Sequence, residues 1–266
     1  MEEENIQLRI WGEATSPALI HLPGLHGDWT LIASFRAAVK DRARFVEFTY
    51  PRTVTWTLED YARGVIDALL ARDIPGGWLI GESFSSQVAW KIHELSLREK
   101  HFNPAGIILA GGFGRYPFFP VVRMTRAVNR AIPMWLLRFL LRGYARYARL
   151  RHRRAPETLS GVGEFVARRT EEDRRAILHR YGLILSSNAA EIARRCQLPV
   201  YGLSGLVDPV VPWPFVLPWL RRNCPGFRGS RVIFNADHNV LGTAPAKSAE
   251  QILRWIEAGP TSHSPS

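Results

Sequence analysis

A serine lies at the centre of the pentapeptide Gly81-Glu82-Ser83-Phe84-Ser85, between a predicted strand and a predicted helix. A serine at the tip of a tight strand-to-helix turn projects its hydroxyl away from the sheet, where it can act as a nucleophile. The residues two before and two after it must be small, and here they are Gly81 and Ser85. The usual pattern has glycine at both positions, and a serine-rich helix cap would look much the same, so the pentapeptide alone leaves both interpretations open.

A serine nucleophile needs a base, and the base needs an acid to orient it. His238 follows a predicted strand at 231–235, and Asp208 follows a predicted strand at 199–204. Each also has an ordinary interpretation: a solvated loop histidine, and a turn-forming aspartate ahead of proline. Asp237 adjoins His238, but side chains of neighbouring loop residues usually diverge, so Asp208 is the preferred acid. Together the candidates follow the order Ser, Asp, His, each after a predicted strand, an order that separates one class of serine hydrolase from the others.

Short apolar runs alternate with helical patterns along most of the chain. This alternation predicts an α/β fold with a mostly parallel sheet and helices on both faces. In such a sheet, loops at the carboxyl ends of the strands gather the chemistry. Strands are predicted at 6–11, 18–22, 44–50, 78–80, 105–110, 199–204 and 231–235, and helices at 29–39, 57–71, 86–100, 215–222 and 246–258.

From its first strands to its last helix, the sequence resembles the α/β-hydrolase fold superfamily. Segment 18–29 is similar to the strand and oxyanion loop of that family, with Pro23-Gly24 where His-Gly is common, and segments 205–212 and 236–241 are similar to its acid and histidine loops. The resemblance implies an oxyanion hole made by the backbone N–H groups of Leu25 and Phe84. It implies no cofactor, and the scattered histidines show no metal-ligand spacing. A serine at the nucleophile position argues against the members that use aspartate there.

The net charge of +11 is concentrated in one segment. Residues 113–195 hold 18 arginines, no lysine and six acidic residues, whereas the rest of the chain holds 17 basic and 18 acidic residues. The family resemblance implies that an insert at this place forms a helical cap over the site. The sequence therefore predicts a hydrolase core at 1–112 and 196–258, a basic helical cap at 113–195 and a disordered tail at 259–266.

Arginines recur at helical spacing within the cap. Arg123, Arg126 and Arg130 share one face, and a second stripe is predicted to lie opposite an aromatic and leucine face. Such helices can lie on an anionic membrane surface or draw an anionic or lipid-like substrate into the cleft. Nucleic acid is not expected, because no nucleic-acid motif appears; a merely solvated arginine surface stays the ordinary alternative. The second stripe comprises Arg138, Arg142, Arg146 and Arg149, and the face predicted opposite it Trp135, Leu136, Phe139, Leu140 and Tyr147.

The acidic start of the chain lacks the pattern of a signal peptide, and Cys196 and Cys224 are too few for a disulfide framework. We therefore expect a cytoplasmic protein, able to lie peripherally on a membrane. The expected activity is hydrolysis of an ester or thioester through an acyl-enzyme on Ser83. Hydrolysis of amide or carbon–carbon bonds, acyl transfer, and a non-catalytic binding or membrane-associated role are the alternatives.

Overall fold

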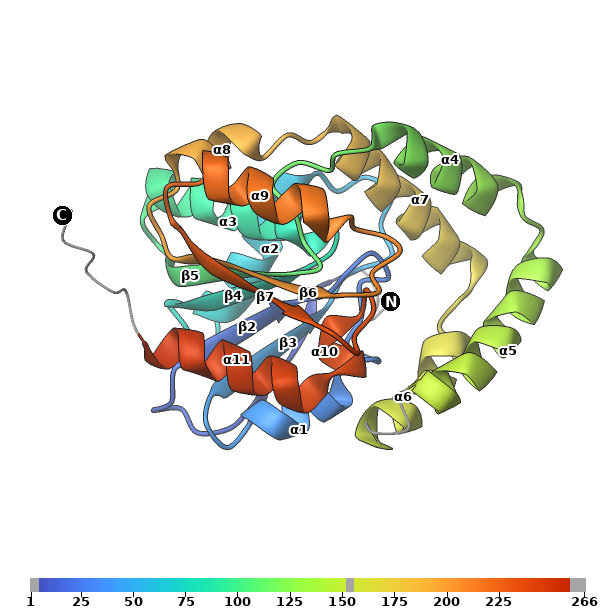
Figure 1. The fold of residues 1–266 in the computed structure, drawn as a ribbon, viewed down its shortest axis with the longest axis horizontal. Coiled ribbons are helices and arrows are strands. Elements are labelled where there is room, and N and C mark those ends of the chain that lie inside the picture. Colours follow the sequence, from blue (N-terminus) through green and yellow to red (C-terminus); the bar gives the residue numbers. More distant parts are fainter. Residues whose placement is uncertain (1–4, 152–155, 259–266) are drawn as a thin grey trace.

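A seven-stranded sheet forms the centre of the computed structural model, which describes residues 5–151 and 156–258 (Figure 1). The tail at 259–266 lies outside the described residues. The strand order is β1-β3-β2-β4-β5-β6-β7, and only β1 runs antiparallel to its neighbour. The predicted mostly parallel sheet is thus confirmed. The strands are β1 (Gln7–Trp11), β2 (Ala18–Leu22), β3 (Arg44–Thr49), β4 (Gly76–Glu82), β5 (Asn103–Ala110), β6 (Val200–Gly205) and β7 (Phe227–Ile233).

Helices cover both faces of the sheet, as the βα alternation predicts (Figure 1). On one face lie α2 (Leu58–Leu70), α3 (Ser85–Glu99) and α9 (Trp213–Asn223), whose buried side chains share one apolar core. On the other lie α1 (Ala33–Val39), α10 (Val240–Thr243) and α11 (Pro245–Glu257), which share a second core. The central strands are buried on both sides, which is why they read as apolar runs rather than alternating ones.

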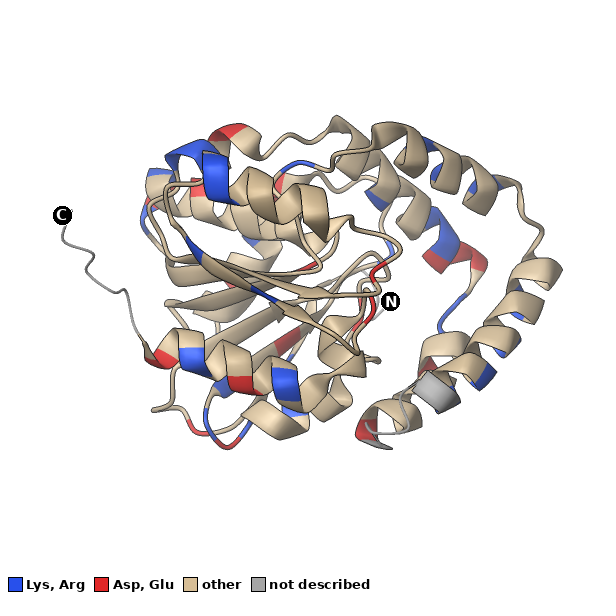
Figure 2. Ribbon diagram, viewed as in Figure 1, with Lys and Arg blue, Asp and Glu red and all other residues tan. Residues whose placement is uncertain are grey.

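Between β5 and β6, the described residues form five helices: α4 (Phe119–Ala131), α5 (Met134–Arg151), α6 (Pro156–Ala167), α7 (Glu171–Ser186) and α8 (Ala190–Arg195). Helices α4 to α7 extend to one side of the sheet, and α8 packs back against α3 and α9. We refer to α4–α7 as the cap. Its outer helices, α4 and α5, carry basic positions and no acidic ones (Figure 2).

Two elements begin four residues from their predicted starts, and the others start within two residues of theirs. The last strand begins at Phe227 rather than at 231. The signal is weak there because Phe227 is followed by Arg228, Gly229 and Ser230, which are not apolar. The first helix begins at Ala33 rather than at 29, since residues 29–32 form a turn before it. By contrast α2 lies within its predicted range, and the side chains of Thr57 and Asp60 form a capping box at its start.

Candidate active site

Ser83 stands at the junction of β4 and α3, in the strained conformation that the pentapeptide predicts. Its φ is +50°, in the left-handed region that is uncommon for residues other than glycine. Its N–H donates to the carbonyl of Ala110 on the neighbouring strand, 3.0 Å away. A Cβ at Gly81 would lie 2.9 Å from the Ser85 carbonyl oxygen and from the Ser86 Cα. The turn therefore requires glycine at 81, as the motif implies.

The three predicted residues Ser83, His238 and Asp208 meet in one hydrogen-bonded chain. The Ser83 hydroxyl lies 2.9 Å from Nε2 of His238, and Nδ1 of the same ring lies 2.9 Å from Oδ2 of Asp208. In the tautomer that suits both contacts, Nδ1–H donates to Asp208 and Nε2 accepts from the serine. Gly111 has a φ of +56°, and a Cβ there would lie 3.2 Å from Nδ1, so this glycine leaves room for the ring.

Asp208 forms a turn and binds the histidine at the same time. Its Oδ1 accepts hydrogen bonds from the N–H groups of Val210 and Val211, at 2.8 and 2.9 Å, while Oδ2 faces His238. Asp208 therefore fits both interpretations given above, the turn-forming aspartate and the acid that orients His238. Asp237 turns away and accepts from the N–H of Asn239 and from the hydroxyl of Thr243.

The electrostatic surroundings of His238 favour its protonated form. Burial by itself lowers the pKa of the imidazole, but the hydrogen bond and charge of Asp208, aided by Glu82 and Asp237, outweigh it. The net effect raises the pKa above its ordinary value of 6.5. A histidine in this setting accepts a proton readily and stabilises the imidazolium that results.

The predicted oxyanion loop is a turn over residues 24–27, closed by a hydrogen bond from the Gly27 N–H to the Gly24 carbonyl. A Cβ at Gly24 would lie 3.6 Å from the Cβ of Ser83, so the loop passes directly beside the serine. Among the described residues, neither the Leu25 N–H nor the Phe84 N–H donates a hydrogen bond to a protein group. Both N–H groups remain available for a ligand oxygen.

Ser85, which departs from the usual glycine, ties the serine turn to this loop. Its hydroxyl donates to the carbonyl of Pro23 and lies 2.9 Å from the hydroxyl of Tyr50. The extra hydroxyl is therefore fully bonded inside the core, which explains why serine is tolerated at a position that usually lacks a side chain.

Arg180 of α7 lies beneath the oxyanion loop, fully buried. Its guanidinium donates to the Leu25 carbonyl at 2.9 Å, the Pro51 carbonyl at 3.0 Å and the Tyr61 hydroxyl at 3.2 Å. Gly27, with φ of +73°, lies so close that a Cβ there would be 2.5 Å from the guanidinium. A cap residue thus supports the turn that carries the Leu25 N–H.

Two further polar residues surround the site. The carboxylate of Glu82 lies 2.9 Å from Nε2 of the buried His21. His26 faces the cavity and packs edge-on against Phe165 of α6, with ring centroids 5.0 Å apart. Enclosure by the protein, followed by the charge of Arg169, lowers the pKa of His26, so this imidazole is neutral at pH 7.

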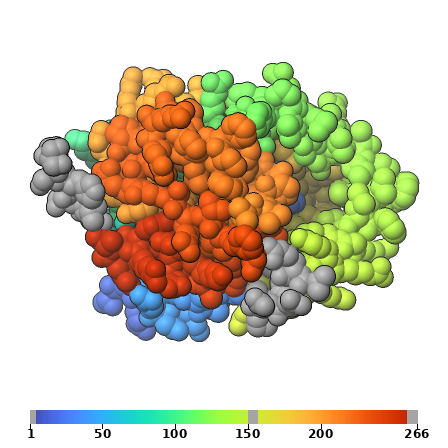
Figure 3. Space-filling model, viewed as in Figure 1, coloured from blue at the N-terminus to red at the C-terminus, as the bar shows by residue number. Residues whose placement is uncertain are grey.

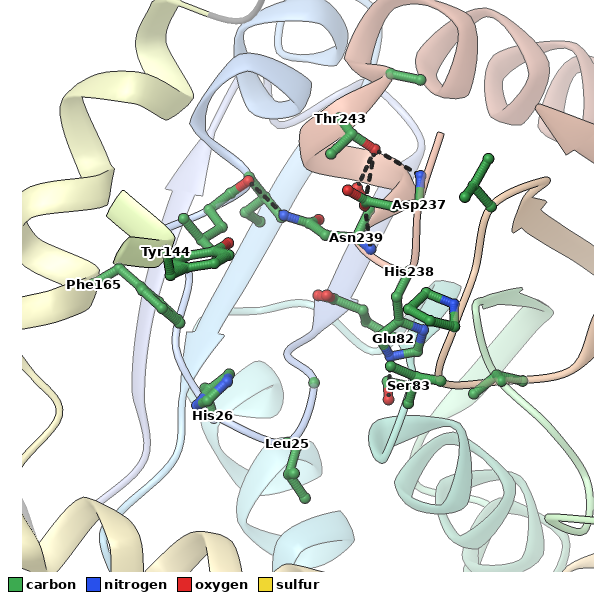
Figure 4. Close-up of a pocket in the computed structure, with 18 of the residues that line it drawn as sticks. Leu25, His26, Glu82, Ser83, Tyr144, Phe165, Asp237, His238, Asn239 and Thr243 are labelled. Atoms are coloured by element: carbon green, nitrogen blue, oxygen red, sulfur yellow. Dashed lines mark hydrogen bonds between the residues drawn. The ribbon is translucent and has the colours of Figure 1, made fainter. Parts of the chain in front are cut away.

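Ser83 and His238 open onto a cavity of about 1590 Å³ between the core and the cap (Figures 3 and 4). Leu25, His26, Tyr144 and Phe165 lie around it in the close-up. Most of the lining side chains are aliphatic or aromatic, and its charged members are Asp28, Glu82, Asp237, His238 if protonated, and Lys247. All of the cap arginines are absent from the described lining.

Comparison with known proteins relates this architecture to solved structures. No model of a known protein family matches the chain, and no curated protein matches its sequence. An α/β-hydrolase from a Medee basin deep-sea metagenome library superposes with a TM-score of 0.71 at 13% identity, over 95% of this chain and 94% of its own. This chain has the α/β-hydrolase fold.

Two further solved structures match over nearly the whole chain. The enol-lactonase from Burkholderia xenovorans LB400 gives a TM-score of 0.74 at 17% identity, covering 95% of this chain and 96% of its own. An esterase from Exiguobacterium antarcticum gives 0.73 at 14% identity, covering 95% of each. At these identities the likeness establishes the fold.

Sequence reasoning missed the residues that support the candidate site from distant positions in the chain. Arg180 is 155 positions from Leu25, and nothing in its surroundings distinguishes it from the other cap arginines. Glu82, which follows no catalytic pattern in the sequence, lies between His21 and the cavity. Among the described residues, no group of three His, Cys, Asp or Glu side chains is placed to hold a metal ion.

Proposed function

We propose that this chain is a serine hydrolase that cleaves an ester or thioester of an apolar acyl group through an acyl-enzyme on Ser83. The observation that carries the proposal is the hydrogen-bonded chain from Ser83 through His238 to Asp208, with both contacts at 2.9 Å, on the wall of an apolar cavity. The esterase and the enol-lactonase that share the fold add support for attack on an ester carbonyl.

Acylation begins when Oγ of Ser83 attacks the carbonyl carbon and its proton passes to Nε2 of His238. The carbonyl π electrons move to the oxygen, where the N–H groups of Leu25 and Phe84 stabilise the negative charge, each worth ~3–4 kcal/mol. The C=O bond then re-forms, the bond to the leaving oxygen or sulfur breaks, and that atom takes the proton from His238.

Deacylation repeats these steps with water. His238 takes a proton from a water molecule, the hydroxide attacks the acyl carbon, and the oxyanion forms in the same hole. When the C=O bond re-forms, the bond to Ser83 breaks and the serine oxygen takes the proton back from His238. The free acid leaves. Asp208 holds the imidazole in the required tautomer throughout.

The cavity favours an apolar, uncharged acyl group over an anionic one. Its volume exceeds the ~300–1,000 Å³ of ordinary ligand pockets, which leaves room for a long chain. Three carboxylates, on Asp28, Glu82 and Asp237, lie in the described lining against one lysine. Arg169 is paired with Asp28, so Glu82 and Asp237 are the carboxylates that would repel an anionic substrate, and the described lining holds no arginine.

Hydrolysis of p-nitrophenyl esters from two to sixteen carbons tests the proposal. We expect turnover that improves with chain length and falls by several orders of magnitude in Ser83→Ala. Ser96→Ala, a serine of α3 whose hydroxyl only bonds the Ile92 carbonyl, is the matched control and should keep full activity. Equal rates for wild type and Ser83→Ala would rule the proposal out and favour the binding-protein alternative. Amide or carbon–carbon hydrolysis and acyl transfer use the same residues and are separated by product analysis.

A further inference from the structure

The outer face of α5 combines arginines with exposed aromatic side chains. Arg138, Arg142, Arg146 and Arg149 are all exposed, and Trp135 and Phe139 are 71% and 65% exposed. Each aromatic residue precedes an arginine by three positions, a spacing that places both on one helical face. The sequence-based prediction that Trp135 and Phe139 lie opposite the arginines is therefore wrong, whereas it is right for Leu140 and Tyr147, which line the cavity.

The inner face of α5 lines the cavity with Leu137, Leu140, Leu141, Tyr144 and Tyr147. The helix therefore carries apolar side chains on two sides, one facing the cavity and one facing solvent. Of these, Leu137, Leu141 and Tyr144 are partly buried, and Leu140 and Tyr147, 51% and 53% exposed, face the open cavity. Trp135 and Phe139 are not needed for that burial and contact solvent instead.

The arginines of this surface have no protein partners in the described part of the chain. None of Arg138, Arg142, Arg146 and Arg149 forms a hydrogen bond or ion pair there, and residues 119–151 contain no acidic residue (Figure 2). Neighbouring α4 continues the pattern with exposed Arg123 and Arg130. It also exposes Met124 and Val128, which are 63% and 56% exposed. We call these residues of α4 and α5 the outer cap surface.

We propose that the outer cap surface binds the headgroup region of an anionic phospholipid bilayer. Guanidinium groups form charge-assisted hydrogen bonds with lipid phosphates, and each basic residue near such a surface contributes roughly a fivefold gain in binding. Tryptophan favours the membrane–water interface, where its ring is apolar and its N–H stays hydrated. An acidic protein or a nucleic acid would engage the arginines but would offer no acyl region to Met124, Val128 and Phe139.

The docked orientation would bring a source of acyl chains to the helix that lines the cavity. This last point rests on the proposed function, whereas bilayer binding does not. None of the helices in the described residues is long and apolar enough to cross a membrane. The geometry therefore points to a protein that lies on the bilayer rather than one that spans it.

Flotation with vesicles of phosphatidylcholine alone, or with 30% phosphatidylserine, tests the inference on the full chain. We expect binding only to the anionic vesicles, weakened by 0.5 M NaCl. The double variant Arg138→Glu/Arg142→Glu should weaken that binding at least about tenfold. Arg221→Glu/Arg222→Glu, on α9, makes the same charge change on exposed residues elsewhere and should bind as the wild type does.

The exposed aromatic residues are tested separately. Trp135→Ala/Phe139→Ala should also bind more weakly than the wild type, and Leu97→Ala, at an exposed apolar residue of α3, is its control.

Three results would overturn the inference: equal binding to both kinds of vesicle, no binding to either, or equal losses in the α5 and α9 charge variants. Competition that removes the protein from anionic vesicles at equimolar RNA phosphate would assign the surface to nucleic acid and overturn it too. Hydrolysis of p-nitrophenyl butyrate, measured without vesicles, should be unchanged in all these variants, because none of the substituted residues lines the cavity. Failure of docking and failure of the proposed hydrolysis are thus read from separate measurements.

Discussion

At the scale of single residues, the candidate site is supported by buried groups that do not line the cavity. Arg180 donates to the Leu25 carbonyl and Ser85 to the Pro23 carbonyl, so two hydrogen bonds fix the loop that carries the proposed oxyanion donor. Buried charged groups of this kind are stable only when their hydrogen bonds are satisfied, and Arg180 satisfies its own with backbone carbonyls and Tyr61. We regard Arg180 as a positioning residue.

Arg180→Lys should therefore lower kcat more than it changes KM. An ammonium cannot reach both carbonyls and the Tyr61 hydroxyl in the planar arrangement of a guanidinium, so the turn loosens and the oxyanion donor shifts. We expect kcat to fall about 10- to 100-fold for a short p-nitrophenyl ester, with KM nearly unchanged. Arg175→Lys, exposed on the same helix, is the control. A wild-type kcat in folded Arg180→Lys would contradict the role.

The pH dependence of kcat/KM should report the raised pKa of His238. The neutral imidazole is the base, so activity is lost as the pH falls through its pKa. Because that pKa lies above 6.5, the midpoint of the acidic limb should lie above 6.5 as well. Asp208→Asn removes the charge that raises the pKa, so the midpoint should move to lower pH while kcat drops roughly 10⁴-fold. Asp67→Asn, at an exposed position of α2, should leave the profile unchanged; an unchanged midpoint in Asp208→Asn would contradict this account.

Sequence reasoning could find Ser83, Asp208 and His238 because each follows a strand, and strands of a parallel sheet end at one edge. It could not find Arg180, because its contact with Leu25 exists only after the cap has folded onto the core. Nor could it choose between the turn-forming and the catalytic interpretation of Asp208. The structure shows one oxygen forming the turn and the other facing the histidine.

At the scale of elements, the segment between α6 and α7 binds the cap to the chain just after the turn at 24–27. The buried Arg169 donates to Asp28 and lies 3.3 Å from Asp173. Burial alone would raise the pKa of Asp28, but Arg169 and Thr30 reverse that effect and hold the pKa below its usual range. A second attachment lies nearby, where the Ser34 hydroxyl of α1 donates to Glu157 at 2.7 Å.

Asp28→Asn should destabilise the protein by about 3 kcal/mol, because it leaves a buried guanidinium without its main counterion. Urea unfolding at pH 7 measures this change, and Asp41→Asn, at an exposed position, is the control. A change of less than about 0.5 kcal/mol, the usual effect of a surface substitution, would show that the pair does not hold the segment between α6 and α7.

The two faces of α5 should respond differently to the same enlargement. Leu137→Trp adds bulk on the face that lines the cavity, so we expect the preferred p-nitrophenyl ester to become shorter by several carbons. Phe139→Trp adds bulk on the outer face and should leave the preference unchanged. A shift in both variants, or in neither, would contradict the assignment of the faces. The sequence placed Phe139 on the wrong face because an apolar residue in an amphipathic helix normally packs inward.

At the scale of the whole molecule, basic charge and apolar volume are separated. The described arginines of α4 and α5 are exposed on the outside of the cap, whereas Arg169 and Arg180 are buried beneath it. Apolar side chains and three carboxylates line the cavity. The sequence shows how large the excess charge is and which segment carries it. It does not show whether the charged side chains face solvent or the cavity. Their orientation depends on how α5 rotates against α6 and the core, which no local pattern specifies.

Most of the fold could be predicted from the sequence, because alternating buried strands and helices allow few other arrangements. The division into a core at 1–112 and 196–258 and a cap at 113–195 stays a prediction. The structure does show that α8, inside the predicted insert, packs against α3 and α9 of the core.

In the proposed mechanism, Ser83 is a nucleophile activated by His238. A fluorophosphonate probe tests it most directly, because it reacts only with an activated serine and its site can be mapped by peptide mass spectrometry. We predict stoichiometric labelling at Ser83 in the wild type, none in Ser83→Ala, and labelling slowed by orders of magnitude in His238→Ala. Folded wild-type protein that stays unlabelled, or that carries the label at another serine, would contradict the claim.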